Sequence, residues 1–243
     1  MRFFVGLHQP SDAHGFSASF ISINRIKDRQ SDFRVGDWIM DSGAFTEVST
    51  HGGYRDSVEM YAWQINRWKG VGNLLAAVSQ DYMCEPFILK KTGLSVLEHQ
   101  AMTISRYDKL QALTDVYVMP VLQGFAPAEY ARHVLMYGAR LKLGQWVGVG
   151  SICKRNADPA AIIAVFEAIH AVRPDLLLHG FGLKVTALAN AVVRSHLHTA
   201  DSMAWSYRAR KAMQHDCTGH GGNSPKEAKK FVRRINRFLL DDI

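Results

Sequence analysis

The sequence predicts an α/β fold, and more closely a TIM-like (β/α)8 barrel with an irregular or missing eighth unit. Short apolar runs alternate with segments of helical periodicity, which is typical of a parallel sheet covered by helices. A chain of 243 residues fits one such barrel, so we expect residues 1–243 to form a single domain. A doubly wound open sheet is the alternative. It is disfavoured because neither a G-x-G-x-x-G nor a P-loop fingerprint follows the first apolar run.

The expected strands are the apolar runs, and the expected helices are segments in which apolar residues recur at helical spacing. Strands are predicted at 2–7, 37–40, 73–78, 116–122, 146–149 and 176–178. Helices are predicted at 57–68, 95–113, 127–142, from 159 onward, 186–197 and 225–240. Residues 13–32 have a mixed pattern, which we interpret as a loop with a short helix.

Polar side chains follow these strands at the points where the strands end. In a barrel the carboxyl ends lie on one face, which is the face where active sites are built. Asp41-Ser42 and Asp201-Ser202 repeat one Asp-Ser pair, although Asp201 and Ser202 would also suit a helix N-cap. The expected pocket is lined by Asp41, Asp81, Gln123, Ser151, His179 and Asp201.

Several aspartates facing one pocket indicate a catalytic site, because close carboxylates raise one another's pKa. Two carboxylates that flank a glycosidic bond can break it: one attacks C1 of the sugar and the other handles the proton of the leaving group. Asp41 and Asp201 fit this pair. A metal-dependent hydrolase is disfavoured, because His179 is the one histidine that ends a predicted strand.

The remaining polar residues of the pocket would hold a flat base. The Asp81 carboxylate can accept hydrogen bonds from a base such as guanine, and the Gln123 amide suits an amide edge. Glycine permits a close approach of the backbone to a ring. His179 either orients the base or a carboxylate, or is a structural histidine. We assign substrate binding to Ser42, Asp81, Gln123, Gly148, Val149, Gly150 and His179.

Basic residues are concentrated near the C-terminus. The chain has 29 Lys and Arg against 22 Asp and Glu, which gives a net charge of +7. A basic C-terminal extension at about 208–243 is a candidate phosphate-binding face, and a solvated helix face is the alternative. The candidate nucleic-acid contacts are Arg208, Arg210, Lys211, Lys230 and Arg234.

The order of the motifs resembles the tRNA-guanine transglycosylase superfamily over residues 2–211. Within it, the chain is most similar to the short DpdA-like proteins of phages and bacteria that insert deazaguanine into DNA. The motifs that carry the resemblance are Asp41-Ser42-Gly43-Ala44-Phe45, Val121-Leu122-Gln123-Gly124, Val147-Gly148-Val149-Gly150-Ser151 and the Asp201 segment. Closer matches to the DpdA-like branch are Ser79-Gln80-Asp81-Tyr82-Met83-Cys84-Glu85-Pro86, Gly150-Ser151-Ile152-Cys153-Lys154-Arg155 and His179-Gly180-Phe181-Gly182-Leu183-Lys184.

The resemblance implies a barrel and a base exchange in which guanine in DNA is replaced by a 7-deazaguanine base such as 7-cyano-7-deazaguanine. Asp201 would be the nucleophile that bonds to C1′, and Asp41 would be the general acid and base. Asp81, Gln123 and the backbone near 148–150 would hold the base. The target nucleotide would have to be flipped out of a duplex or already single-stranded. The free 7-deazaguanine base is an expected partner, and proteins that open the duplex are candidate partners. The alternatives are exchange in tRNA and a catalytically silent nucleic-acid-binding barrel.

The chain departs from the tRNA enzymes where those carry a zinc-binding cysteine cluster. Here His215, Cys217 and His220 offer three ligands at cramped spacing, whereas structural zinc needs four. We therefore expect no cofactor, with Cys217 and His220 as the weak candidates for zinc. Three scattered cysteines indicate a reducing compartment, and no apolar run is long enough for a membrane span. We expect a cytoplasmic protein, in the host cytoplasm if it is phage-encoded.

Overall fold

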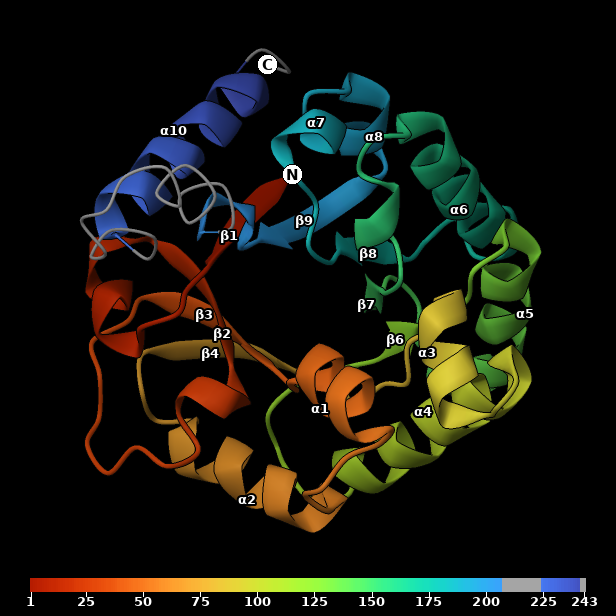
Figure 1. Ribbon diagram of the computed structural model, residues 1–243, viewed down its shortest axis with the longest axis horizontal. Coiled ribbons are helices and arrows are strands. Elements are labelled where there is room, and N and C mark those ends of the chain that lie inside the picture. The colour runs from red at the N-terminus through yellow and green to blue at the C-terminus, as the bar shows by residue number, and fades with distance from the viewer. Residues whose placement is uncertain (207–223, 241–243) are drawn as a thin grey trace.

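The parallel β-sheet curls into a nearly closed, barrel-like ring with helices around it (Figure 1), in a computed structural model that describes residues 1–206 and 224–240. The strand order is β5-β4-β3-β2-β1-β9-β8-β7-β6, and every pairing is parallel. The strands are β1 (Arg2–Gly6), β2 (Ala18–Ser22), β3 (Asp37–Asp41), β4 (Asn73–Val78), β5 (Val118–Met119), β6 (Val121–Leu122), β7 (Trp146–Val149), β8 (Leu177–Gly180) and β9 (Leu197–Ser202).

The ends of this order, β5 and β6, are consecutive in the chain on either side of Pro120. Proline has no N–H, so the ladder is interrupted there. The Ser79 backbone N–H donates to the Met119 carbonyl at 3.0 Å, and the Gly148 N–H donates to the Pro120 carbonyl at 2.8 Å. This segment therefore bonds to β4 on one side and to the β7 strand on the other, which nearly closes the ring.

Helices surround the ring on its outside, apart from α1, which lies across the ring in Figure 1. The α-helices are α1 (Ala44–His51), α2 (Val58–Trp68), α3 (Pro86–Thr92), α4 (Val96–Gln111), α5 (Pro127–Tyr137), α6 (Pro159–Val172), α7 (Val185–Leu188), α8 (Ala191–Ser195) and α10 (Pro225–Leu240). Short 3-10 helices are η1 (Pro10–Gly15), η2 (Ile23–Arg25), η3 (Gly138–Arg140) and η4 (Cys153–Arg155). Over the described residues, none of these helices has the length and apolar content of a membrane span.

Local sequence signals explain where the longer helices begin. Ser57 accepts a hydrogen bond from the Met60 N–H at the start of α2, and Asp158 caps α6 ahead of Pro159. Ser95 and Glu98 form a capping box at the start of α4. These caps agree with the predicted helix starts.

The hydrophobic core forms three clusters, and the two that contain strand residues lie on opposite faces of the sheet. Successive side chains of a strand point to opposite faces. In β1, Phe3 and Val5 join the large cluster under the helices, whereas Phe4 points the other way. Phe4 belongs to a smaller cluster that fills the inside of the ring, together with Ala18, Ile39, Ala76, Val78, Met119 and Val121. Strand residues whose side chains point to the same face as this second cluster can therefore line the mouth of the ring.

The prediction of a loop with a short helix at 13–32 missed strand β2, although the short 3-10 helix η2 does lie in this segment. Its sequence, Ala18-Ser19-Phe20-Ile21-Ser22, mixes serines with apolar residues and lacks the continuous apolar run of the other strands. Pairing with β1 on one side and β3 on the other holds it in place. Tertiary pairing here outweighs a weak local pattern.

The predicted helix at 186–197 was also wrong in its extent. Two short helices, α7 and α8, take its place, and Leu197 begins strand β9. Asn190 separates the two helices, because its side chain caps α8 by accepting from the Val192 and Val193 N–H groups. Asp201 consequently lies in a strand, where the helix N-cap interpretation does not apply.

Candidate active site

Three aspartates reach the mouth of the ring from different strands. Asp41 is the last residue of β3, Asp201 lies near the end of β9, and Asp81 follows β4. Asp41 is in step with Ile39 of the inner cluster, since both lie on the same face of β3. The negative charge of Asp41 acts on Asp81, and that of Asp201 acts on Asp41. The structure therefore brings the three predicted carboxylates together.

Asp41 is half-buried and held by the turn that follows it. The Gly43 N–H donates to its Oδ2 at 3.2 Å, and Gly43 has a φ of 74°, a left-handed conformation that favours glycine. Burial raises the pKa of Asp41 to about 6, the charge of Asp201 adds to the rise, and hydrogen bonds from Ser22 and the turn oppose it. A carboxyl group with this pKa can both give and take a proton near neutral pH.

Asp81 is buried beside Gln123, whose side-chain amide N–H donates to Asp81 Oδ2. Burial raises the pKa of Asp81 to about 7, and the charges of Asp41 and Glu85 add to the rise. Gln123 is held in turn by the Ser151 hydroxyl, which lies 2.8 Å from its Oε1. Asp81 and Gln123 thus form one polar wall with a fixed orientation.

Ser151 connects this wall to Glu85. Its Oγ accepts from the Cys84 N–H at 3.0 Å and lies 3.0 Å from Glu85 Oε2. Ser151 has a φ of 56°, the one positive φ of a non-glycine residue among the described residues. Such a conformation costs free energy and persists where its surroundings fix it. Burial raises the pKa of Glu85, and the hydrogen bond from the Ser151 hydroxyl opposes this rise.

Asp201 is buried and receives two hydrogen-bond donors on one oxygen. The Gly182 N–H donates to Oδ1 at 3.0 Å, and His179 Nε2 lies 3.3 Å from the same atom. Among the described residues, no group bonds to the other carboxylate oxygen, Oδ2. This arrangement fixes the carboxylate by one oxygen and leaves the second available for reaction.

The tautomer of His179 follows from its neighbours. The Trp146 indole N–H is a donor only, and it lies 2.7 Å from Thr199 Oγ1. Thr199 is then able to donate its hydroxyl proton to His179 Nδ1, 2.8 Å away. His179 assigned in this way carries its own proton on Nε2 and donates it to Asp201. The result is a chain of hydrogen bonds, here called the relay, that runs from Trp146 through Thr199 and His179 to the Asp201 carboxylate.

Aromatic rings hold His179 in place inside the ring. The Phe20 ring stacks on it at 5.7 Å with an interplanar angle of 16°, and Phe181 meets it edge-on at 4.7 Å. His179 is fully buried. Its sequence-based interpretation as a group that orients a carboxylate therefore agrees with its contacts to Asp201.

The glycines of β7 make room for side chains of the site. A side chain at Gly148 would collide with the Phe181 ring, and one at Gly150 would collide with the Gln123 amide. The N–H of Gly150 donates to the Leu122 carbonyl at 3.0 Å, so it is already used by the sheet. Val149 between them is fully buried. Binding of a base by residues 148–150 stays a prediction.

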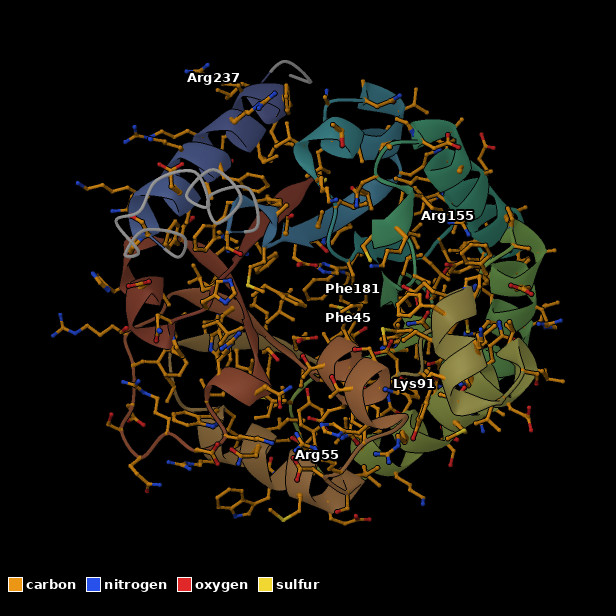
Figure 2. The ribbon with its side chains drawn as sticks, in the orientation of Figure 1. Phe45, Arg55, Lys91, Arg155, Phe181 and Arg237 are labelled. Atoms are coloured by element: carbon orange, nitrogen blue, oxygen red, sulfur yellow. The ribbon has the colours of Figure 1, made fainter. Side chains whose placement is uncertain are left out.

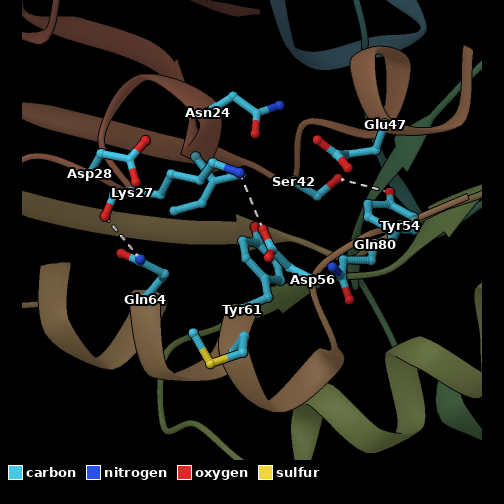
Figure 3. A pocket seen from close by; sticks show the side chains of 12 residues that line it. Asn24, Lys27, Asp28, Ser42, Glu47, Tyr54, Asp56, Tyr61, Gln64 and Gln80 are labelled. Carbon is cyan, nitrogen blue, oxygen red and sulfur yellow. Dashed lines mark hydrogen bonds and ion pairs between the residues drawn. The ribbon is translucent and has the colours of Figure 1, made fainter. Parts of the chain in front are cut away.

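A cavity of about 160 Å³ adjoins the Asp41 turn (Figure 3). Ser42, which is buried, lines it together with Tyr54 and Gln80, whereas none of the three aspartates does. The Ser42 Oγ and the Tyr54 hydroxyl lie 3.4 Å apart, and the Tyr54 hydroxyl donates to the Asp81 carbonyl at 3.0 Å. The cavity is thus a separate polar pocket next to the Asp41 turn, and Ser42 is one of its lining residues.

Several supports of the site were not predicted from the sequence. The Gln123 N–H donates to His133 Nδ1 at 2.8 Å, and the Gln100 side chain donates to the Gln123 carbonyl at 2.6 Å. Burial lowers the pKa of His133 to about 3, so it stays neutral and can accept. The Tyr130 hydroxyl donates to the Gly150 carbonyl at 2.8 Å. One signal was available, since His133 falls on the apolar face of α5 with Tyr130.

The predicted basic contacts are only partly described. Arg208, Arg210 and Lys211 lie outside the described residues, as do the zinc candidates Cys217 and His220, so these stay predictions. On α10, Arg234 is exposed, and Lys230 pairs with Glu227 at 2.6 Å. Over residues 1–206 and 224–240, no group of three or more His, Cys, Asp or Glu side chains is placed to hold a metal.

Comparison with known proteins places the chain in a family. No curated protein matches it. The family described as DeoxyPurine in DNA protein A, or DpdA, matches residues 1–241. The match spans nearly the whole chain, including every strand that carries a carboxylate of the site, and it confirms the resemblance drawn from the motifs. The protein belongs to the DpdA family.

Proposed function

We propose that the protein is a transglycosylase that replaces guanine in DNA with a 7-deazaguanine base, such as 7-cyano-7-deazaguanine. The observation that carries this proposal is the contrast between two facing carboxylates. Asp201 is held by donors on Oδ1 alone, and the pKa of Asp41 is raised to about 6. A fixed nucleophile opposite a proton carrier is what a double displacement at a glycosidic carbon requires. The family match supports DNA as the substrate.

In the first half of the reaction, Asp201 Oδ2 attacks C1′ of the target nucleotide. The C1′–N9 bond breaks, its electron pair goes to the departing guanine, and protonated Asp41 gives that base its proton. The product is an ester between the Asp201 carboxylate and C1′. The N–H groups of Gly182 and His179 keep the carboxylate in one orientation for the attack.

In the second half, the free deazaguanine base enters and ionised Asp41 takes the proton from its N9. N9 attacks C1′, and the C1′–oxygen bond breaks, which restores the Asp201 carboxylate. Two displacements at the same carbon retain its configuration. Asp41 returns to its protonated form, so the proton balance closes over one cycle.

The Asp81–Gln123 wall is proposed to select the base. Guanine and its 7-deaza analogues present N–H donors and a carbonyl acceptor on one edge. An ionised Asp81 can accept from the donors, and the amide of Gln123 can donate to the carbonyl. Because the pKa of Asp81 is about 7, its ionised form is well populated only near and above neutral pH. Base binding should therefore weaken as the pH falls below 7.

The finer architecture follows the same proposal. We infer that β5 and β6 are one strand interrupted at Pro120, which reduces the nine strands to the eight of a (β/α)8-type barrel. The basic extension at 208–243 would contact the phosphate backbone. The target nucleotide would enter the ring flipped out of a duplex or from a single strand.

The experiment combines exchange with trapping. Purified protein is incubated with guanine-containing DNA and labelled 7-cyano-7-deazaguanine, and the DNA nucleosides are identified by mass spectrometry. Denaturing gels without the free base report the covalent adduct. Label in DNA and an adduct that maps to Asp201 are expected. Failure of both, with single-stranded and duplex DNA, overturns the proposal, and label in tRNA alone moves the substrate to RNA.

A further inference from the structure

Three phenylalanine side chains are exposed around the mouth of the ring. Phe45 is 51% exposed just after β3, Phe87 is 48% exposed in α3, and Phe125 is 38% exposed just after β6. Each follows the carboxyl end of a strand that contributes Asp41, Asp81 or Gln123. In Figure 2, Phe45 lies toward the centre of the ring, and Arg237 of α10 lies at its outer edge.

Two cations of η4 lie over these rings. The Lys154 Nζ is 5.4 Å from the ring centres of both Phe45 and Phe87. The Arg155 guanidinium is 4.5 Å from the ring centre of Phe125, and it also donates to the Phe125 carbonyl. Contacts at these distances are typical of cation–π pairs. We name the four residues Phe87, Phe125, Lys154 and Arg155 the mouth rim.

The charges of the mouth rim are not neutralised locally. Within the described part of the chain, neither Lys154 nor Arg155 forms an ion pair. The Arg155 Nε is buried without a hydrogen-bond partner there. Glu85, whose carboxyl feels both cations, is itself buried and bonded to Ser151. The rim therefore offers positive charge to an anion that arrives from solvent.

Exposed aromatic rings next to cations are the features with which proteins hold single-stranded nucleic acid. Bases stack on the rings, and the cations contact the phosphates. A lone exposed phenylalanine needs no explanation. Here, however, residues from three separate segments, α3, the turn after β6 and η4, meet, each ring under a cation. A duplex hides the faces of its bases, so this chemistry favours unpaired nucleotides.

We propose that the mouth rim binds the unpaired DNA nucleotides that flank the target, with bases on Phe87 and Phe125 and phosphates on Lys154 and Arg155. This inference rests on the proposed function and adds the form of the DNA that the site accepts. It places the strand contact at the mouth itself, separate from the basic residues of α10 at the outer edge of the ring.

The test measures binding apart from chemistry. Asp201→Asn keeps the side-chain volume and blocks the covalent step, so a fluorescent single-stranded oligonucleotide of about a dozen nucleotides can be titrated at equilibrium. In this background, Phe87→Leu and Phe125→Leu keep apolar volume and remove the aromatic face. Each should weaken binding about tenfold. Lys154→Ala with Arg155→Ala should lower the slope of log affinity against log salt by about 1.4.

The matched control is Trp63→Leu. Trp63 is also an exposed aromatic, at 54%, with the Arg67 guanidinium 5.8 Å from its ring centre, and it lies on α2. This variant should bind the oligonucleotide as the background does. The affinity for a blunt-ended duplex of the same sequence should not change in either Phe→Leu variant.

Each outcome decides the matter. Equal losses in the control, unchanged affinity in the Phe→Leu variants, or losses confined to the cation variants overturn the stacking role of the mouth rim. If wild-type protein exchanges bases while the rim variants bind normally, the rim inference fails and the proposed function stands. If binding depends on the rim but the protein forms no adduct and exchanges no base, the rim inference stands and the proposed function fails.

Discussion

The β3–β4 side of the mouth and the β9 side carry the same functional group in opposite environments. On the first side, burial raises the pKa of Asp41 to about 6 and that of Asp81 to about 7, so negative charge is disfavoured. On the second side, two N–H groups bond to Asp201 Oδ1 and hold the carboxylate in one orientation. The comparison supports the proposed proton carriers on one side and a carboxylate fixed in orientation on the other.

The difference arises from what surrounds each carboxylate. Asp201 faces His179, which the Trp146–Thr199 relay orients as a donor. Asp41 feels the charge of Asp201, and Asp81 feels that of Asp41; for both groups burial outweighs the hydrogen bonds that the carboxylate accepts. The proposed division into acid–base and nucleophilic carboxylates therefore rests on their environments, as in other enzymes with paired carboxylates. Each prediction below changes one side and leaves the other intact.

The largest effect is expected from Asp201→Asn, which removes the nucleophile from the β9 side. Exchange should fall at least about 10⁴-fold and the covalent adduct should disappear, because an amide oxygen is a poor nucleophile. Mass spectrometry of DNA nucleosides and denaturing gels measure the two. Asp115→Asn, a change of an exposed aspartate paired with Lys69, is the control and should leave both unchanged. An adduct that persists in Asp201→Asn would give the nucleophilic role to another residue.

Asp41→Asn tests the other side by removing the proton carrier. The exchange rate should fall about 10²- to 10⁴-fold. In wild-type protein, adduct formation needs protonated Asp41, so its rate in a single turnover should decrease as the pH rises through about 6. The Asn variant should lack this pH dependence. If the same decrease remains in the variant, Asp41 is not the group that titrates.

Asp81→Asn tests the raised pKa on the β3–β4 side through the pH dependence of the free energy of unfolding. The folded state holds the Asp81 proton up to a pKa of about 7, whereas the usual value is 3.8. The contribution of Asp81 to stability is therefore full below the usual pKa and is lost as the pH rises to about 7. A neutral Asn removes this loss. The free energy of unfolding should decline between pH 5 and 8 by about 2–4 kcal/mol less than in wild type. A smaller decline in the free energy of unfolding remains in this variant, because the pKa of Asp41 is also raised, to about 6.

Urea unfolding at pH 5 and pH 8 measures this difference. Asp115→Asn is again the control, because Lys69 lowers the pKa of Asp115 and keeps it ionised throughout this range. A pH dependence in Asp81→Asn that matches wild type would show that Asp81 is ionised in the folded protein at both pH values. The two sides of the mouth would then differ less than proposed.

The positions of the site residues could be predicted because parallel strands place their carboxyl ends together. Asp41 needed only the strand pattern. No strand was predicted before Asp201, because residues 186–197 were expected to form one helix, and β9 was therefore missed. β2 was missed because two serines break its apolar run, and pairing with β1 and β3 stabilises it instead. Local pattern thus suffices where a strand is continuously apolar.

The supports of the site depend on spatial contacts that no local pattern contains. Thr199 faces His179 because the register between β8 and β9 shifts between Leu178 and His179. Phe87 and Lys154 meet although they are 67 positions apart in the chain. Such pairs become visible only when the strands are assembled into a ring.

The smallest effect is expected from Thr199→Val, which breaks the relay behind His179. Valine keeps the shape of the buried side chain but cannot donate to His179 Nδ1, so the ring is free to carry its proton there and stop donating to Asp201. A less well oriented nucleophile should lower kcat about tenfold while the KM for DNA stays constant, since Thr199 does not reach the mouth rim. Thr199→Ser restores the hydroxyl and should restore kcat. A parallel rise in KM, or a failure of serine to rescue, would mean that Thr199 supports packing alone and that Gly182 is sufficient to orient the β9 carboxylate.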